Sequence, residues 1–293
     1  MESEGRFYAI TQPEYRGLGG FRRLWNQSRN ELCSLLWEAT QSEPLTEAIR
    51  PLNPIDPAAT PILGAGVTFS SSLRERRLEA MRGGRIEEVT DDGRPTPYDV
   101  VYDPANPPEV FFKAILPGHL AKPNQIWIRP DGALDGGMGS SVPEPERVLI
   151  LDQHGEIVAE TIGSDTTARQ LESRSPLYLP AAKTYSRCTT LCPWLTVFNP
   201  AIDREPVVIS MEILRKGKRV YRDEYSSDQM KRTPESLVRN ARTMVSGVGF
   251  ALFTGTGIIP PVEFSLAAGD VVIIDSPQLG RLEAKTQIVR FDF

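Results

Sequence analysis

Two glutamates stand two positions apart in the segment VPEPERVLIL, and an aspartate follows further along the chain. Glu144 and Glu146 would point to the same face of a β-strand, because side chains alternate between the two faces. Pro143 and Pro145 suit the edge or mouth of such a strand, since proline cannot donate to a ladder. Clustered carboxylates are ligands that hard divalent cations prefer. The spacing therefore indicates a metal site, provided that a third acid such as Asp165 joins them.

The residues that follow are predicted to form a β-hairpin over 146–165, which would bring Asp165 to the two glutamates. With His154-Gly155 as a two-residue turn, position 144 faces position 165. Opposed residues of an antiparallel pair share a face, with Cβ atoms about 5 Å apart. Glu144, Glu146 and Asp165 would then converge, although a slip of one residue would move Asp165 to the other face. The same face would carry Val148, Ile150, Ile157 and Ala159.

The apolar character of this face decides what the acids need. Three converging carboxylates in an apolar surround cannot all stay ionised without a cation, because desolvation and mutual repulsion both raise their pKa. Oxygen ligands favour Mg²⁺, with Mn²⁺ or Ca²⁺ as alternatives, over zinc. The competing interpretation is a group of solvated acids on a surface hairpin, which the residue pattern alone leaves open.

Three more charged residues are candidates for a role at such a site. Lys183, in PLYLPAAKTY, could neutralise a carboxylate or an enolate near the metal, and the alternative is an ordinary surface lysine. Glu109 begins the strand-like segment EVFFKA and could act as a general base, although a glutamate at a strand start is usually just exposed. Arg169 follows Asp165 by four residues and could form a local salt bridge, and a structural role is expected for it.

Histidines and cysteines offer less chemistry. His119 and His154 are the only histidines, and His154 is expected to be exposed in the turn. Serine-hydrolase chemistry is disfavoured, because no Gly-x-Ser-x-Gly elbow occurs. Cys188 and Cys192 lack the second ligand pair of a zinc site and are expected to be small buried residues. With Cys33 they make three cysteines, too few and too odd for a disulfide framework, which favours a reducing, cytoplasmic setting.

The elements that must position these residues are mostly short strands. The sequence predicts strands over 63–69, 108–116, 125–130, 271–275 and 286–293, and a second hairpin over 207–225 that turns at Lys216-Gly217. Helices are predicted over 21–40 and 72–82, and from Pro234 to about Met244 with Thr233 as the N-cap. Strands and helices do not alternate, so a doubly wound sheet is excluded.

The positions of prolines indicate how the chain divides into domains, and its composition limits the possible functions. Four prolines within 51–61 indicate a linker, so residues 1–61 are predicted to form a small N-terminal α/β domain with this linker and residues 62–293 a catalytic domain. A net charge of -5 gives no basic surface for nucleic acid. No apolar run approaches the length of a membrane span, and the N-terminus lacks a basic, apolar signal region. The glycine-rich segment 131–141 is expected to be a surface loop rather than a phosphate-binding loop.

Five segments resemble, in order, motifs of the fumarylacetoacetate hydrolase superfamily: PEVFFKA, PEPE, SDTTARQLE, PLYLPAAKTY and FTGTGIIPP. The resemblance covers roughly residues 62–293 and is strongest to the branch that contains 2-keto-3-deoxy-D-arabinonate dehydratase. It implies an α+β, mostly β fold, a mixed β-sandwich roll preceded by a small N-terminal domain, and a homodimer. The first 60 or so residues match only loosely.

The resemblance also implies roles for individual residues. It implies three Mg²⁺ ligands: Glu144, Glu146 and Asp165. It implies a substrate pocket lined by a Thr-Gly-Thr loop: Thr254, Gly255 and Thr256. Lys183 would match the active-site lysine, and Glu109 a catalytic glutamate of the dehydratase branch. Ser72 stands where the superfamily's hydrolases carry a general-base histidine.

Three functions remain open on this basis, all with a small 2-oxo acid as ligand. The first is dehydration of a 2-keto-3-deoxy pentonate, in which Mg²⁺ stabilises an enolate, Glu109 removes a C3 proton and Lys183 stabilises oxyanion charge. The second is C–C bond hydrolysis of acylpyruvates or other 1,3-diketo acids, which the missing histidine disfavours. The third is a non-catalytic metal- or sugar-acid-binding protein, since one fold hosts several functions.

Overall fold

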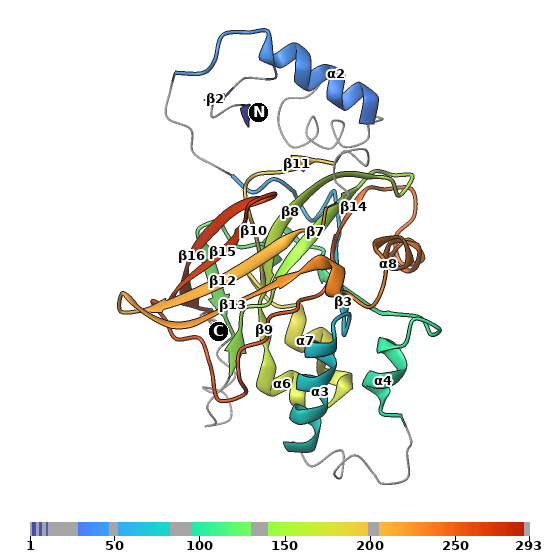
Figure 1. Ribbon diagram of the computed structural model, residues 1–293, viewed down its shortest axis with the longest axis vertical. Coiled ribbons are helices and arrows are strands. Elements are labelled where there is room, and N and C mark those ends of the chain that lie inside the picture. The colour runs from blue at the N-terminus through green and yellow to red at the C-terminus, as the bar shows by residue number, and fades with distance from the viewer. Residues whose placement is uncertain are drawn as a thin grey trace.

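Two β-sheets packed face to face dominate the computed structural model, and helices gather around them (Figure 1). The structure describes residues 2–3, 6–7, 10, 29–46, 52–82, 95–129, 140–198 and 205–289. Residues 21–28 of the helix expected over 21–40 lie outside these residues, as does most of the glycine-rich segment 131–141, and the rest of that helix is confirmed over 29–40. The arrangement confirms the predicted mostly-β sandwich, with both parallel and antiparallel pairs in its sheets.

The larger sheet has seven strands in the order β10-β8-β7-β14-β3-β4, with β11 paired to β8. Its strands are β3 (Ile62–Gly66), β4 (Glu109–Ala114), β7 (Pro145–Leu151), β8 (Ile157–Asp165), β10 (Thr189–Leu191), β11 (Thr196–Val197) and β14 (Phe250–Phe253). The β14 strand was not predicted, although it lies centrally between β7 and β3 and pairs with β3 in parallel. The predicted strands at 63–69 and 108–116 are confirmed as β3 and β4.

The pairing of β7 with β8 confirms the register on which the metal prediction depends. Glu146 faces Gly163 across the hairpin. Glu144 and Asp165, at its open end, exchange two backbone hydrogen bonds of 3.3 and 2.9 Å. The two glutamates and Asp165 therefore share a face of the sheet, as the predicted pairing of position 144 with position 165 required.

The predicted two-residue turn of this hairpin is nevertheless wrong. The backbone N–H of Asp152 donates to the carbonyl of Glu156, so residues 153–155 form a three-residue loop. The Asp152 carboxylate favours this loop, because it accepts from the backbone N–H groups of His154, inside the loop, and of Glu156, which follows it. Val158 is skipped in the register and acts as a β-bulge that restores the expected pairing. Ile157 consequently packs on the opposite face from the acids.

The smaller sheet has five strands in the order β13-β12-β15-β16-β5. They are β5 (Gln125–Ile128), β12 (Val208–Arg215), β13 (Lys218–Ser226), β15 (Val271–Ser276) and β16 (Gly280–Ile288). The second predicted hairpin is confirmed as β12–β13, and Lys216 and Gly217 form its turn with φ of 52° and 75°. Two positive φ values match the twist of a tight hairpin. Two-stranded pairs complete the β-structure: β1 (Glu2–Ser3) with β2 (Arg6–Phe7), and β6 (Ser141–Val142) with β9 (Thr167–Ala168).

Among the described residues, the α-helices lie at the two ends and one side of the roll (Figure 1). They are α2 (Arg29–Thr40), α3 (Ser70–Arg82), α4 (Pro97–Tyr102), α6 (Arg169–Arg174), α7 (Leu179–Lys183) and α8 (Pro234–Ala241). Four of them, α3, α4, α6 and α7, gather at the end opposite α2. The side chain of Thr233 caps α8 as predicted, by accepting from the N–H of Ser236, but the helix ends three residues before Met244. Within the described residues, no helix has the length and apolar character needed to cross a membrane.

Apolar side chains fill the space between these layers. Alternate residues of β12, Ile209, Met211 and Ile213, point into the core between the sheets. The apolar part of the acids' face of β7 packs in a second cluster that contains Leu32 and Leu35 of α2. Burying each leucine stabilises the fold by roughly 2 kcal/mol. Part of the N-terminal region thus packs directly on the roll, and the division at residue 61 stays a prediction.

Candidate metal centre

Glu144, Glu146 and Asp165 come together at the open end of the β7–β8 hairpin. Each offers one carboxylate oxygen, and these oxygens lie within 4.8 Å of one another. Glu146 and Asp165 are only 2% and 1% exposed, while Glu144 is less deeply buried. An all-oxygen set of this kind fits a hard divalent cation such as Mg²⁺. Burial also makes the interpretation as solvated surface acids wrong.

The acids do not share one electrostatic environment. Burial raises the pKa of Glu146, and the nearby charges of Asp165 and Glu144 raise it further. The backbone N–H of Gly255 offsets part of this by donating to Glu146 Oε2 over 2.6 Å. Burial also acts on Asp165, but the ammonium groups of Lys113 and Lys183 outweigh it and lower the pKa of that carboxyl. The centre therefore combines an acid that is costly to ionise with one that is held as a carboxylate.

Lys183 lies at the end of α7 and is buried among these acids, so the alternative of a surface lysine is wrong. Its Nζ is 2.6 Å from Glu144 Oε2 and 3.1 Å from Asp165 Oδ2, and it donates to Thr167 Oγ1 over 2.7 Å. Burial alone would lower the pKa of Lys183, but the surrounding carboxylates, Asp165 first, raise it. The side chain is thus a fixed cation beside the candidate metal ligands.

Glu109 projects from β4 on the same side of the sheet as Phe111. A Cβ on Gly66 would overlap the Glu109 carboxylate, and one on Gly64 would overlap the Phe111 ring. The two glycines of β3 therefore make room for these side chains. Lys183 Nζ lies 5.7 Å from the centre of the Phe111 ring. Burial raises the pKa of Glu109, which brings this half-buried carboxyl closer to the range where a general base works.

The Thr-Gly-Thr loop follows β14 and reaches the centre through its glycine. Gly255 has a φ of 92°, a conformation that favours glycine, and its N–H contacts Glu146 as described above. The hydroxyl of Thr254 donates to the carbonyl of Arg147 over 3.0 Å. The hydroxyl of Thr256 accepts from the N–H of Ile258 over 3.0 Å. Both threonine hydroxyls thus fix the shape of the loop.

A second layer of charged residues, missed in the sequence, joins α3 to α6. Arg76 of α3 donates to Glu172 of α6 and lies 3.6 Å from Glu79. Glu172 is also 3.9 Å from Lys183, so the layer continues into the metal centre. Burial raises the pKa of Glu172, but the charges of Arg76 and Lys183 outweigh it and lower that pKa. The only local signal was the Arg-x-x-Glu spacing within both helices, which places each pair on one helix face.

Arg169 belongs to this second layer, and its predicted salt bridge with Asp165 is wrong. Its Nε lies 3.0 Å from Glu79 Oε1, and its guanidinium donates to the carbonyls of Pro260 and Pro261 over 2.6 and 2.9 Å. Burial raises the pKa of Glu79 to about 7, although Arg76 lowers it. Arg169 thus ties α3 to the segment that follows the Thr-Gly-Thr loop, which is a structural role of longer range than predicted.

The remaining candidates stand apart from the carboxylates. His154 is exposed in the hairpin loop, and Cys188 and Cys192 are buried free thiols, as predicted. His119 is half-buried, and its Nδ1 accepts from the N–H of Ile115 over 3.3 Å. The hydroxyl of Ser72 bonds both backbone groups of Phe69 at the start of α3, where it cannot replace a histidine base.

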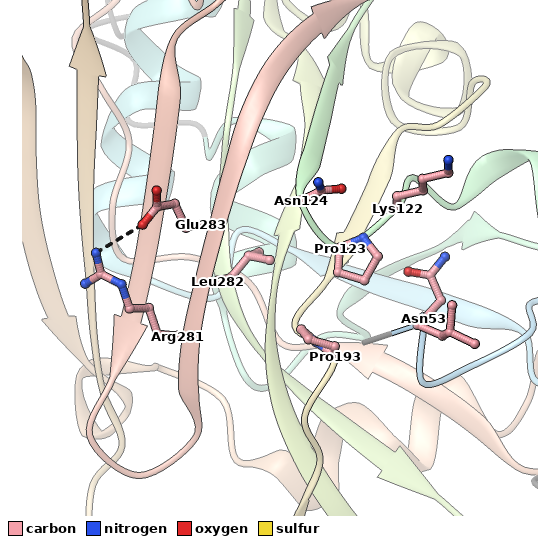
Figure 2. A pocket seen from close by; sticks show the side chains of 9 residues that line it. Asn53, Lys122, Pro123, Asn124, Pro193, Arg281, Leu282 and Glu283 are labelled. Atoms are coloured by element: carbon pink, nitrogen blue, oxygen red, sulfur yellow. Dashed lines mark hydrogen bonds and ion pairs between the residues drawn. The ribbon is translucent and has the colours of Figure 1, made fainter. Parts of the chain in front are cut away.

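A separate surface hollow of about 390 Å³ lies between β16, the segment before β5 and the chain near Asn53 (Figure 2). Its charged lining residues include Lys122, Arg281 and Glu283, and Arg281 pairs with Glu283 over 3.4 Å. None of the residues predicted for the metal centre lines this hollow.

The fold has known counterparts. A fumarylacetoacetate hydrolase from Exiguobacterium antarcticum is 20% identical, with a TM-score of 0.64 over 98% of this chain and 94% of that one, and this likeness concerns the fold alone. The molecule thus has the fold of the fumarylacetoacetate hydrolases, with a buried carboxylate cluster at the end of one hairpin. No family model matches the sequence.

Proteins of similar sequence show to which branch of this fold class the chain belongs. A probable 2-keto-3-deoxyxylonate dehydratase of Haloferax volcanii is 35% identical over 232 residues, which are 78% of this chain and 72% of that protein. The structure of 2-keto-3-deoxy-D-arabinonate dehydratase complexed with magnesium and 2,5-dioxopentanoate is 26% identical, with a TM-score of 0.67 over 85% of this chain and 84% of that one. The chain belongs to the fumarylacetoacetate hydrolase superfamily, in the branch of the 2-keto-3-deoxy sugar-acid dehydratases.

Proposed function

We propose that this protein is a Mg²⁺-dependent hydro-lyase that removes water from a 2-keto-3-deoxy pentonate. The observation that supports this most is the convergence of three carboxylates, two of them fully buried, with the Lys183 ammonium. The relative at 35% identity is named for the acid derived from xylose, and the solved relative holds magnesium and 2,5-dioxopentanoate. Both names point to five-carbon 2-keto-3-deoxy acids as the substrate class.

Glu144, Glu146 and Asp165 would hold the ion, and their oxygen ligands favour Mg²⁺, with Mn²⁺ or Ca²⁺ as substitutes. Mg²⁺ bound there would act as a Lewis acid toward the 2-oxo acid end of the substrate and make the C3 protons more acidic. Negative charge then develops on the 2-oxo oxygen as C3 loses a proton. The Lys183 ammonium, fixed beside the ligands, stabilises that charge.

Glu109 is proposed as the base that takes the C3 proton, because its carboxyl is half-buried and its pKa is raised. The C4–O bond then breaks, and the proton held by Glu109 accompanies the hydroxide, so that one water leaves. The unsaturated 2-oxo acid that remains tautomerises to 2,5-dioxopentanoate. The loop Thr254–Gly255–Thr256 is proposed to line the substrate pocket, since it contacts Glu146 through Gly255.

Two accompanying properties are also proposed. The first is a cytoplasmic location, which suits the free thiols of Cys33, Cys188 and Cys192. The second is a homodimer, which the superfamily resemblance implies. Light scattering of the purified protein would measure its mass directly, and a monomeric mass at assay concentration would contradict the homodimer.

The experiment that tests the function compares two substrate classes. The Mg²⁺-loaded protein is incubated with 2-keto-3-deoxy pentonates of both C4 configurations and with acylpyruvates, and the products are followed by mass spectrometry. We expect loss of water from at least one pentonate and little acylpyruvate cleavage, because the only half-buried histidine, His119, bonds to backbone rather than to the carboxylates. Acylpyruvate cleavage that disappears in His119→Ala would support the hydrolase instead. Mg²⁺ binding without any turnover would support the non-catalytic alternative.

A further inference from the structure

We propose that Lys113 is a positioning residue that fixes Asp165 and Lys183 relative to each other, and so sets the orientation of the Asp165 carboxylate toward the metal. This inference rests on the proposed function for the identity of the ion. Lys113 is 0% exposed and is one of the largest fully buried side chains of the molecule.

The Lys113 ammonium lies against three oxygen atoms. Its Nζ forms an ion pair of 2.6 Å with Asp165 Oδ1. It also donates to the backbone carbonyls of Thr166 over 3.0 Å and of Lys183 over 2.5 Å. An ammonium group carries three N–H donors and no acceptor. Lys113 thus links a candidate metal ligand to the backbone of the residue that supplies the active-site ammonium.

A β-bulge in strand β4 lies at Lys113 and directs its side chain toward Asp165. The register of β3 with β4 pairs Leu63 with Phe112 and Ile62 with Ala114, so that Lys113 is skipped. Such a β-bulge re-aims a side chain and is frequent beside active sites. The same strand supplies Glu109 from its regular part. One strand therefore provides the proposed base and, through its bulge, a cation behind the metal ligands.

The contacts on Asp165 involve both of its oxygens. Oδ1 is paired with Lys113, and Oδ2 lies 3.1 Å from Lys183 Nζ. The two buried ammonium groups therefore hold the Asp165 carboxylate from two sides and fix its orientation toward Glu144 and Glu146. Partners that orient a ligand carboxylate in this way alter metal affinity without touching the metal.

The contact between Lys113 and the Lys183 carbonyl holds the C-terminal end of helix α7. The helix α7 has only five residues, so its own hydrogen bonds hold it weakly. Two cations bind carbonyls near its C-terminal end: Lys113 at Lys183 and Arg129 at Ala181. Cations are favourable at this end of a helix. Lys113 therefore also limits how far the Lys183 side chain can move away from the carboxylates.

The test measures Mg²⁺ affinity by calorimetry in the absence of substrate, together with kcat and KM. Lys113→Met keeps the length of the side chain and removes the ammonium, and we expect Mg²⁺ binding about 10–100-fold weaker, with a fall in kcat rather than a rise in KM. Lys113→Arg keeps the charge but not the three-donor geometry, so it should recover part of the affinity. Tyr185→Phe is the matched control, because the Tyr185 hydroxyl donates to the same Thr166 carbonyl as Lys113, over 3.3 Å, and to the Trp127 carbonyl over 3.1 Å.

The outcomes separate this inference from the proposed function. If Lys113→Met binds Mg²⁺ as the wild type does, or if Tyr185→Phe weakens binding equally, Lys113 is only a structural residue and the inference is overturned. Should Lys113→Met not fold, Lys113→Gln is compared with Lys113→Arg, and equal Mg²⁺ affinities would overturn the inference. A wild type that binds Mg²⁺ but dehydrates no substrate contradicts the proposed function alone, and the affinities of the variants still decide the role of Lys113. A wild type that binds no divalent ion overturns both.

Discussion

The two long hairpins of the molecule are built alike and buried differently. The β7–β8 hairpin lies inside the seven-stranded sheet, and nearly every residue of both strands is buried. The β12–β13 hairpin lies at the edge of the five-stranded sheet, where β12 alternates buried and less buried residues and β13 is mostly exposed. Sheets packed on one face show this alternation, whereas strands buried on both faces are apolar throughout.

Both hairpins carry acids, and their surroundings decide what those acids can do. Asp223 and Glu224 of β13 are exposed, so water solvates their charge and no partner is required. Glu146 and Asp165 of the central hairpin are almost completely buried, and burying a charge without compensation costs several kcal/mol. Carboxylates thus become candidate metal ligands through burial in a strand that is otherwise apolar, rather than through their number.

The first prediction removes one acid from each hairpin and compares the effects on activity. Asp165→Ala should lower kcat/KM by about a thousandfold or more, because a lost ligand forfeits several kcal/mol of metal-dependent stabilisation. Asp223→Ala removes the same side chain from the edge hairpin and should leave kcat/KM within about twofold, as expected of a surface substitution. Steady-state kinetics and Mg²⁺ calorimetry check both variants. Undiminished Mg²⁺ binding by Asp165→Ala would contradict the assignment of the centre.

The second prediction removes the buried cation of the central hairpin's acids. Lys183→Met should lower kcat by about a hundredfold or more, since a preorganised charge at the reacting oxygen is lost. Without Mg²⁺, breaking these buried ion pairs should also reduce the free energy of unfolding by roughly 3–5 kcal/mol. Saturating Mg²⁺ should restore part of that stability, because the ion binds only the folded protein.

Thermal unfolding with and without Mg²⁺, compared with turnover, checks this second prediction. Lys218→Met, on the exposed start of β13, is the control and should change neither quantity. A Lys183→Met protein that is destabilised equally with and without Mg²⁺, yet retains normal turnover per folded molecule, would mean that Lys183 is a structural ion-pair partner only.

The difference between the hairpins also explains what the sequence could predict. The convergence of Glu144, Glu146 and Asp165 was predictable, because all three belong to one hairpin whose pairing is local. The bulge at Val158 was not predictable from the pattern, since it compensates a loop length that the Asp152 side chain selects. The predicted register was therefore right for the acids although the turn was wrong.

Features that depend on contacts distant in the sequence were missed. Lys113 reaches Asp165 from another strand, and Arg76 reaches Glu172 from another helix, so neither pairing leaves a spacing to detect. The helices α6 and α7 have six and five residues, too short for a periodic pattern. The central strand β14 has the four-residue sequence FALF, and such a short apolar run does not distinguish strand from helix.

The third prediction concerns the buried carboxyl of Glu79, which should make the free energy of unfolding depend on pH. The pKa of Glu79 is raised from 4.5 to about 7 in the folded protein, so between these values the native state binds more protons than the unfolded state. The stabilisation from protonated Glu79 is therefore complete below about pH 4.5 and is lost as pH rises through about 7, by roughly 3 kcal/mol at most. Glu79→Gln should flatten this part of the stability curve. Urea unfolding at several pH values checks it, with the exposed Glu224→Gln as control, and an unchanged slope in Glu79→Gln would contradict it.

The fourth prediction concerns the room made for Glu109 beside the central strands. Gly66→Ala should displace the Glu109 carboxylate, because a Cβ there would overlap it. We expect kcat to fall about 10- to 100-fold, because a well-placed general base contributes roughly 100- to 10,000-fold and a displaced one keeps part of that effect, while Mg²⁺ affinity stays near that of the wild type. Gly118→Ala is the control, since nothing lies within 4 Å of a Cβ at that position. A normal kcat in Gly66→Ala would argue against Glu109 as the base.

The last prediction concerns the turn of the β12–β13 hairpin. Lys216 has a φ of 52° and Gly217 a φ of 75°, so the edge hairpin places a lysine where L side chains are strained and asparagine is tolerated well. Lys216→Asn should therefore raise the free energy of unfolding by about 0.5 kcal/mol and leave kcat unchanged, because the turn is exposed and belongs to the edge hairpin. Lys218→Asn removes the same charge from the start of β13, where no positive φ is relieved, and should give no gain. Urea unfolding of both variants measures the difference. A gain of equal size in both would mean that surface charge, rather than backbone strain in the turn, limits the stability of this hairpin.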